Sequence, residues 1–328
     1  MSYMMATATM EDVTLKHSAL ALLVALLWGL NFVVIDEGLD GVPPLLFVAL
    51  RFILVAVPAI FFVKPPQIGW RNVVAIGFFM SFGQFALLYL ALHLGMPAGL
   101  ASLVLQTQVI LTVMVAAGLL GERPSGRQLI GVIVGTLGLG VVIVGHSIVA
   151  PWVPLVITVG AALSWAIGNV LSRRAKAASG LSLVVWSALV VPLPSAALAV
   201  LLDGPDVVWL ALTHLSGFAI LSTLYTAVAA SLIGYGIWNS LMARYPTSAV
   251  VPFTLLVPVI GIAAAWLVQG EVPTVTEILG GAVMLTGLAT AVISTGNRRR
   301  LLEVPRSGAG AEPQRLDPVG DKVDDSLR

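Results

Sequence analysis

Ten long apolar runs follow one another along this chain, and they limit what it can fold into. A helix needs about 20 apolar residues to cross about 30 Å of hydrocarbon, because each residue advances it by about 1.5 Å. The runs therefore predict ten spanning helices in an all-α membrane protein. They cover residues 18–36, 44–63, 72–93, 97–120, 127–145, 152–172, 181–202, 214–241, 247–268 and 274–295.

The composition indicates a surface that faces lipid. Only 10% of the residues are charged, whereas a soluble domain carries roughly 25% charged residues to keep its surface hydrated. The net charge of +1 argues against nucleic acid as a partner. There is no cysteine, and the four histidines stand at no metal-ligand spacing. We therefore expect neither a metal nor a cofactor.

Basic and acidic residues separate into alternate loops. The loops after the second, fourth, sixth and eighth runs hold Lys64, Arg71, Arg123, Arg127, Arg173, Arg174, Lys176 and Arg244. The other loops lack Lys and Arg, and their acidic residues are Asp36, Glu37, Asp40, Asp203, Asp206 and Glu271. Lys16 and Arg298–Arg300 make both ends of the apolar region basic. Because basic residues mark the cytoplasmic side, both termini are expected there, which requires an even number of spans.

Six residues of the first half recur in the second half at a constant offset of 149. They are Pro97, Gly121, Glu122, Pro124, Gly131 and Gly138, which return as Pro246, Gly270, Glu271, Pro273, Gly280 and Gly287. Trp28 and Asn31 also resemble Trp165 and Asn169, at a shorter offset. One repeat holds five predicted helices, and two copies of an odd number of spans must lie in opposite orientations.

The repeat predicts four regions along the chain. They are a cytoplasmic segment 1–17, a first repeat 18–145, an inverted second repeat 152–296 and a disordered cytoplasmic tail 297–328. Inverted repeats are typical of transporters, because the two halves can exchange conformations and open one central site to each side in turn. A gene duplication with only structural meaning is the alternative.

Five stretches carry a resemblance to a known family. They are WGLNFVVI (28–35), PPLLFVALRF (43–52), GMPAGLASLVLQTQ (95–108), GERP (121–124) and YGIWNSLMARYP (235–246). Residues 18–296 resemble the EamA branch of the drug/metabolite transporter superfamily, and within it bacterial exporters of amino acids and of metabolites such as O-acetylserine. The resemblance implies a ten-helix bundle in the bacterial inner membrane, with a central cavity lined by helices 1, 3, 4, 6, 8 and 9. It does not fix the substrate.

Polar side chains inside apolar runs need an explanation, because polar groups are costly in hydrocarbon. The candidates for a binding site are Gln84, Tyr89, His93, Gln106, Gln108, Trp165, Asn169, Tyr235, Trp238 and Asn239. Neutral amide, phenol and indole groups suit a zwitterionic solute such as an amino acid, because they bind its ammonium and carboxylate without fixing a net charge. For any single residue, a hydrogen bond that only joins neighbouring helices is the alternative.

Arg51 is the one charged residue that lies well inside a run, away from its ends. It either anchors a solute carboxylate, or its side chain reaches the interface or bonds to carbonyls. We favour the second role, since the helix of residues 44–63 is expected at the periphery. No Asp or Glu lies in the middle of a run. This argues against small multidrug pumps that use a buried carboxylate, and leaves His93 as a group that could titrate.

These features favour a secondary transporter that exports amino acids or related small metabolites by alternating access. Transport of other metabolites or drugs is the main alternative. An intramembrane enzyme would need a nucleophile with a base, or paired buried carboxylates, and neither occurs at catalytic spacing. A channel usually relies on a symmetric oligomer, whereas we expect a monomer whose partners are the lipid bilayer and a small solute.

Overall fold

A computed structural model of the chain describes residues 14–147, 152–176, 179–245 and 247–292. Within these ranges the regular elements are helices, and there is no strand. Nine helices in these ranges are long and apolar enough to cross a membrane by length and composition. An all-α fold with many spanning helices is therefore confirmed.

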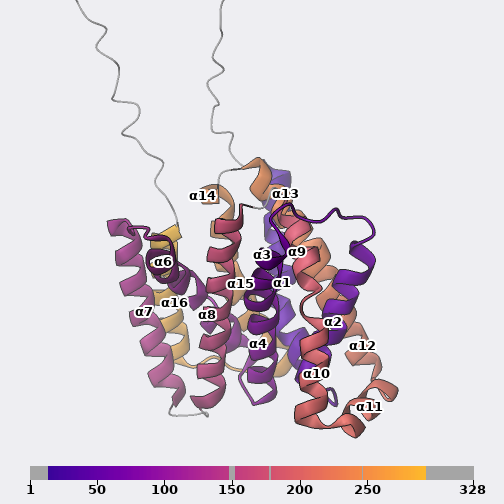
Figure 1. The fold of residues 1–328 in the computed structure, drawn as a ribbon. Coiled ribbons are helices and arrows are strands. Elements are labelled where there is room, and N and C mark those ends of the chain that lie inside the picture. The colour runs from indigo at the N-terminus through magenta and orange to yellow at the C-terminus, as the bar shows by residue number, and fades with distance from the viewer. Residues whose placement is uncertain (1–13, 148–151, 177–178, 246, 293–328) are drawn as a thin grey trace, which may run out of the picture. The chain divides into compact units, whose positions relative to one another are not determined.

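The elements follow the order of the apolar runs (Figure 1). The first half contains α1 (Leu15–Gly38), α2 (Pro44–Ala59), α3 (Trp70–Ile76), η1 (Gly77–Gly83), α4 (Gln84–His93), α5 (Ala98–Val104), α6 (Thr107–Leu120) and α7 (Gly126–Ser147). The second half contains α8 (Trp152–Ala175), α9 (Gly180–Ala188), α10 (Pro192–Asp203), α11 (Pro205–Thr213), α12 (Gly217–Leu224), η2 (Tyr225–Ile233), α13 (Gly234–Arg244), α14 (Thr247–Val250), η3 (Val251–Leu255), α15 (Leu256–Gln269) and α16 (Val275–Val292). Several spans are thus made of two or three elements in succession.

The helix α2 is shorter than the nine long helices. Its 16 residues extend about 24 Å at about 1.5 Å per residue. The apolar run continues to residue 63, but the helix ends at Ala59. Pro65 and Pro66 follow, and Pro65 disfavours helical backbone at Lys64, so the helix does not resume at the end of the run. Pro58 is tolerated inside the last turn of the helix.

The third and eighth spans share an interruption at their centre, where η1 and η2 are π-helical. In each, the amide that follows the segment donates to the carbonyl five residues before it. The offset of 149 places residues 77–83 onto 226–232, which lie inside η2. The sequence does not predict these segments, because a π-helical turn has no distinct residue pattern.

The fourth and ninth spans also share an interruption. The fourth breaks at Leu105–Gln106, between α5 and α6. The offset of 149 moves this break to residues 254–255, the end of the 3-10 helix η3 that precedes α15. Both spans then end at a glycine in the left-handed conformation, Gly121 with φ 66° and Gly270 with φ 72°. Glycine adopts this conformation without steric cost, which explains why it recurs at this position.

Glycines allow α7 and α16 to pack closely. A Cβ on Gly138 would lie 2.7 Å from the Gly280 carbonyl oxygen, and one on Gly131 would lie 2.6 Å from the Gly287 carbonyl oxygen. Backbones approach this closely only where no side chain intervenes. Residue numbers fall along α16 as they rise along α7, so the two helices are antiparallel.

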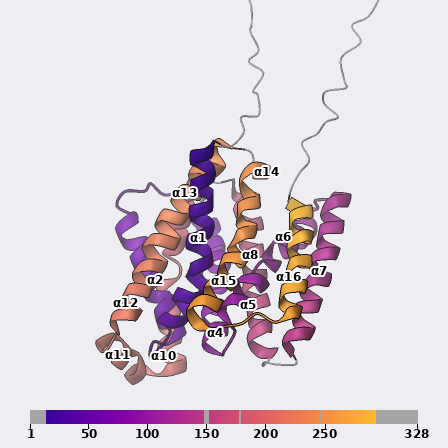
Figure 2. The same ribbon diagram turned by 180° about the vertical axis from the view of Figure 1, so that it is seen from behind.

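The described chain begins and ends on the same side of the helices. The start of α1 and the end of α16 lie at the same end of the bundle in both views (Figures 1 and 2). This is the arrangement that an even number of crossings produces.

We expect Gly138→Ala to destabilise the protein, because its methyl group would meet the Met284 amide and the Gly280 carbonyl, and backbone atoms cannot rotate aside. Overpacking of this kind costs about 1–3 kcal/mol. Gly140→Ala is the matched control on the same helix, since nothing lies within 4 Å of a Cβ there. Thermal unfolding in detergent compares the two. A melting temperature of Gly138→Ala equal to that of the parent would contradict the close packing.

Candidate functional site

The π-helix η2 offers a backbone acceptor to another helix. Trp28 of α1 donates through Nε1 to the Ala230 carbonyl at 2.9 Å. The amide that follows η2, that of Gly234, donates to the carbonyls on either side of Ala230. The interruption therefore leaves an acceptor inside the bundle, and an indole from a helix of the first half satisfies it.

The π-helix η1 is bonded to α8 in a corresponding way. Ser164 Oγ donates to the Phe79 carbonyl at 2.7 Å. Further along α8, Asn169 Nδ2 donates to Gln108 Oε1 at 3.2 Å. Thus α8 bonds to both interrupted spans of the first half. Gln108 and Asn169 are two of the sequence candidates, and the structure brings them together.

Arg51 is buried in α2, with 1% of its surface exposed. Its two terminal nitrogens donate to Tyr89 Oη at 3.1 Å and to Ser231 Oγ at 2.9 Å. The guanidinium carbon lies 4.0 Å from the ring centroid of Phe85. These contacts correct the expectation that Arg51 reaches the interface or bonds to carbonyls. The expectation was wrong because α2 is not peripheral: it packs against α4, α10 and η2.

Three aromatic rings form a cluster beside η2. The ring centroid of Trp28 lies 5.1 Å from that of Tyr235 and 5.4 Å from that of Trp238. All three side chains are half-buried. The cluster therefore joins α1 to α13 and brings together two sequence candidates with a tryptophan that was not among them.

Two glutamines are buried next to the interruptions of the first half. Gln84 follows η1 directly, and Gln106 lies in the break between α5 and α6. Among the described residues, neither Gln84 Oε1 nor Asn31 Oδ1 has a hydrogen-bond partner. Buried polar atoms without partners are rare, and a bound ligand is one of the few explanations for them.

The remaining candidates lie in different surroundings. Trp165 is half-buried on α8, one residue after Ser164. His93 is exposed at the last position of α4. Asn239 lies against Gly180 at the start of α9. Among the described residues, no hydrogen bond joins the side chain of His93 or of Asn239 to one of the helix interruptions.

Trp28, Asn31 and Ser231 lie at the site but were missing from the candidates. Trp28 carried a signal, since it matches Trp165 in the sequence repeat. Ser231 carried none, because a single serine in an apolar run is common and only its contact with Arg51 distinguishes it.

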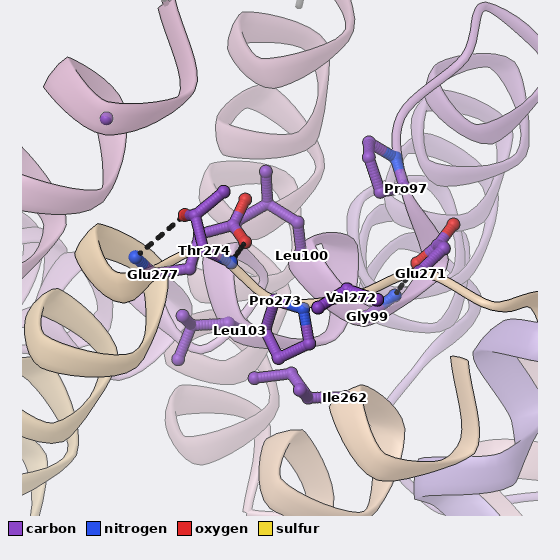
Figure 3. Close-up of a pocket in the computed structure, with 11 residues that line it drawn as sticks. Pro97, Gly99, Leu100, Leu103, Ile262, Glu271, Val272, Pro273, Thr274 and Glu277 are labelled. Atoms are coloured by element: carbon purple, nitrogen blue, oxygen red, sulfur yellow. Dashed lines mark hydrogen bonds between the residues drawn. The ribbon is translucent and has the colours of Figure 1, made fainter. Parts of the chain in front are cut away.

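A pocket of about 220 Å³ lies where α5 begins, between α5, α15 and α16 (Figure 3). Both carboxylates in its wall are bonded. Glu271 accepts hydrogen bonds from the amides of Ala98 and Gly99, each at 3.1 Å. Glu277 accepts one from the Thr274 amide at 2.8 Å, at the start of α16. We call the contact of Glu271 with Ala98 and Gly99 the Glu271 latch.

A second pocket of about 70 Å³ is formed by the corresponding residues of the first half. Val113, Glu122, Arg123, Pro124 and Gln128 line it, 149 positions before Ile262, Glu271, Val272, Pro273 and Glu277 of the first pocket. Here the glutamate is bonded differently: Glu122 pairs with Arg173 of α8 at 3.1 Å. None of the ten sequence candidates lines either of these two pockets.

The comparison with known proteins identifies the family. Two successive matches to the EamA-like transporter family cover residues 15–144 and 152–293. The chain belongs to the EamA-like transporter family. It is therefore a membrane transporter and not an enzyme, and the resemblance drawn from its motifs is confirmed.

Relatives within and around this family carry names of exporters. A "Probable amino-acid metabolite efflux pump" of Escherichia coli (strain K12) is 43% identical over 280 residues, which cover 83% of this chain and 93% of the relative. A "Probable terminal-alkyne amino-acid exporter" of Streptantibioticus cattleyicolor is 29% identical over 213 residues, or 64% of this chain and 69% of the relative. One solved crystal structure is 22% identical, with a TM-score of 0.58, and covers 85% of this chain and 97% of that chain. That likeness shows a shared fold.

Proposed function

We propose that this protein exports amino acids or related small zwitterionic metabolites across the bacterial inner membrane by alternating access. The observation that carries the proposal is that two helix interruptions recur at the same offset of 149 residues in both halves. Interrupted helices at corresponding positions of two repeats are the best pointer to a transporter's binding site. The names of the relatives, which refer to amino-acid metabolites and amino acids, supply the substrate class.

We infer that the bundle has ten spans in two inverted repeats, 18–145 and 152–296. The helix α2 adds one span to the nine long helices of the described chain. The contacts of α7 with α16 support a two-fold relation between the repeats. Gly131 corresponds to Gly280 and Gly138 to Gly287, yet Gly131 contacts Gly287 and Gly138 contacts Gly280. A two-fold axis produces this reciprocal pattern.

The packing between the halves supports the same relation. The first helix of each half lies against the fourth span of the other: α1 packs on α15, and α8 packs on α6. Each also bonds to the other half's π-helix, α1 to η2 and α8 to η1. The basic loops then favour an orientation with both termini in the cytoplasm.

The proposed solute site lies at these interruptions. The candidates that we retain are Gln84, Tyr89, Gln106, Gln108, Trp165, Asn169, Tyr235 and Trp238. The unpartnered oxygens of Gln84 and Asn31 suit the solute's ammonium group, which donates hydrogen bonds and accepts none. His93 and Asn239 are left out, because the first is exposed and the second lies against α9.

The Glu271 latch is the proposed gate at one end of the site. Its carboxylate joins the segment after α15 to the start of α5, in the other half. The corresponding Glu122 bonds to Arg173 instead. In an alternating cycle, each state closes one end of the site and opens the other. The equivalent glutamates of the two halves should therefore have different partners in any one state, as Glu271 and Glu122 do. In the opposite state, the Glu271 latch opens.

Transport by purified protein in proteoliposomes tests the solute site. We expect counterflow of labelled amino acids, lowered in each of Gln84→Ala, Gln108→Ala and Trp238→Ala. Losing one contact of about 1 kcal/mol corresponds to about a fivefold loss of transport. His93→Ala is the control with expected parental transport. Normal transport in all three variants would refute the site, and counterflow of drugs but of no amino acid would refute the substrate class.

Labelling of single cysteines tests the Glu271 latch, since the chain has no cysteine of its own. Ile262→Cys and Val113→Cys are equivalent reporters, one in each pocket. We expect Glu271→Gln to raise labelling of Ile262→Cys by a membrane-impermeant thiol reagent and to lower labelling of Val113→Cys. The reason is that a neutral amide caps the amides of α5 less strongly than a carboxylate does. Unchanged labelling at both positions would rule the latch out as a gate.

A further inference from the structure

The positive charge of Arg51 is buried without an anion. Its side chain is 1% exposed, and no described carboxylate lies within ion-pair distance of it. An uncompensated charge in a protein interior costs several kcal/mol, and more where the surroundings are hydrocarbon. A packing role alone does not require such a charge, since an uncharged side chain would fill the same space without this cost.

The partners that Arg51 does have are neutral. Tyr89 Oη and Ser231 Oγ accept hydrogen bonds from its terminal nitrogens, and Phe85 lies under the guanidinium plane. Hydroxyl dipoles and a ring orient the guanidinium but leave its net charge in place. Its Nε has no acceptor among the described residues. The guanidinium is therefore held in position, but its Nε–H has no acceptor and its positive charge has no counter-ion among the described residues.

Arg51 also lies where both halves meet at the proposed site. Tyr89 stands on α4, which continues η1, and Ser231 belongs to η2. Ser231 is adjacent in the chain to Ala230, whose carbonyl accepts the indole of Trp28. The Arg51 guanidinium is thus bonded to two interrupted spans, the third span of the first half and the third span of the second half.

We propose that Arg51 binds the carboxylate of the transported solute, with Tyr89 and Ser231 as positioning residues. A carboxylate accepts two parallel hydrogen bonds from the planar guanidinium, a match that lysine cannot reproduce. The carboxylate takes the free Nε–H together with the N–H now bonded to Ser231, whose hydroxyl retains the Thr226 carbonyl as acceptor. This inference rests on the proposed function and specifies how its site recognises a carboxylate.

The test measures a charge preference rather than activity alone. Proteoliposomes with the parent, Arg51→Gln, Arg51→Lys and the exposed control Arg174→Gln are compared for transport of matched solutes. Each amino acid is paired with its carboxamide, and simple carboxylates are paired with their amides. We expect the parent and Arg174→Gln to prefer the carboxylate by at least about tenfold, because charge-assisted hydrogen bonds are the stronger ones.

In Arg51→Gln this preference should fall to near unity while transport of the carboxamide persists, and Arg51→Lys should retain part of it. An equal loss for both solutes in Arg51→Gln and Arg51→Lys, with parental melting temperatures, overturns the inference. If the parent carries no amino acid, the proposed function fails. The simple carboxylates and their amides then test Arg51 alone. If the preference for the carboxylate does not depend on Arg51, this inference fails as well.

Discussion

Polar groups inside hydrocarbon must find their partners within the protein, because no water reaches them there. An uninterrupted helix meets this condition by itself, but the third and fourth spans of each half do not. In the third span of each half, carbonyls accept hydrogen bonds from side chains of helices distant in sequence, Trp28 for Ala230 and Ser164 for Phe79. The donors come from the first helix of the opposite half, so the interruptions hold the two halves together.

The contacts between the halves differ in kind. The glycine contacts of α7 with α16 bring the two backbones so close that an added Cβ would clash, and such packing tolerates little displacement. The Glu271 latch has two hydrogen bonds and the Gln108–Asn169 contact has one, and such polar contacts can exchange partners. In the proposed cycle the glycine contacts stay closed, while the polar contacts of the two halves alternate.

The spans and the repeat were predictable because they depend on local properties. Hydropathy shows where the spans lie, although α2 ends before its apolar run does. The recurrence of Gly121 as Gly270 reflects one backbone conformation that glycine adopts at both helix ends. The π-helical segments were not predictable, since a π-helical turn has no distinct residue pattern. Likewise, the burial of Arg51 depends on Tyr89 and Ser231, which lie 38 and 180 residues away in the chain. The candidates Gln108 and Asn169 were identified by residue type, but only the fold showed that they bond to each other.

Distances at the two ends of the bundle test alternating access most directly. Spin labels on the pair Leu94→Cys and Val272→Cys report on one end, and labels on the equivalent pair Ala243→Cys and Arg123→Cys, 149 positions away, report on the other. All four positions are exposed. Addition of a transported amino acid should shift the two distance distributions in opposite directions. Distributions that stay fixed, or that both widen or both narrow, would contradict the account.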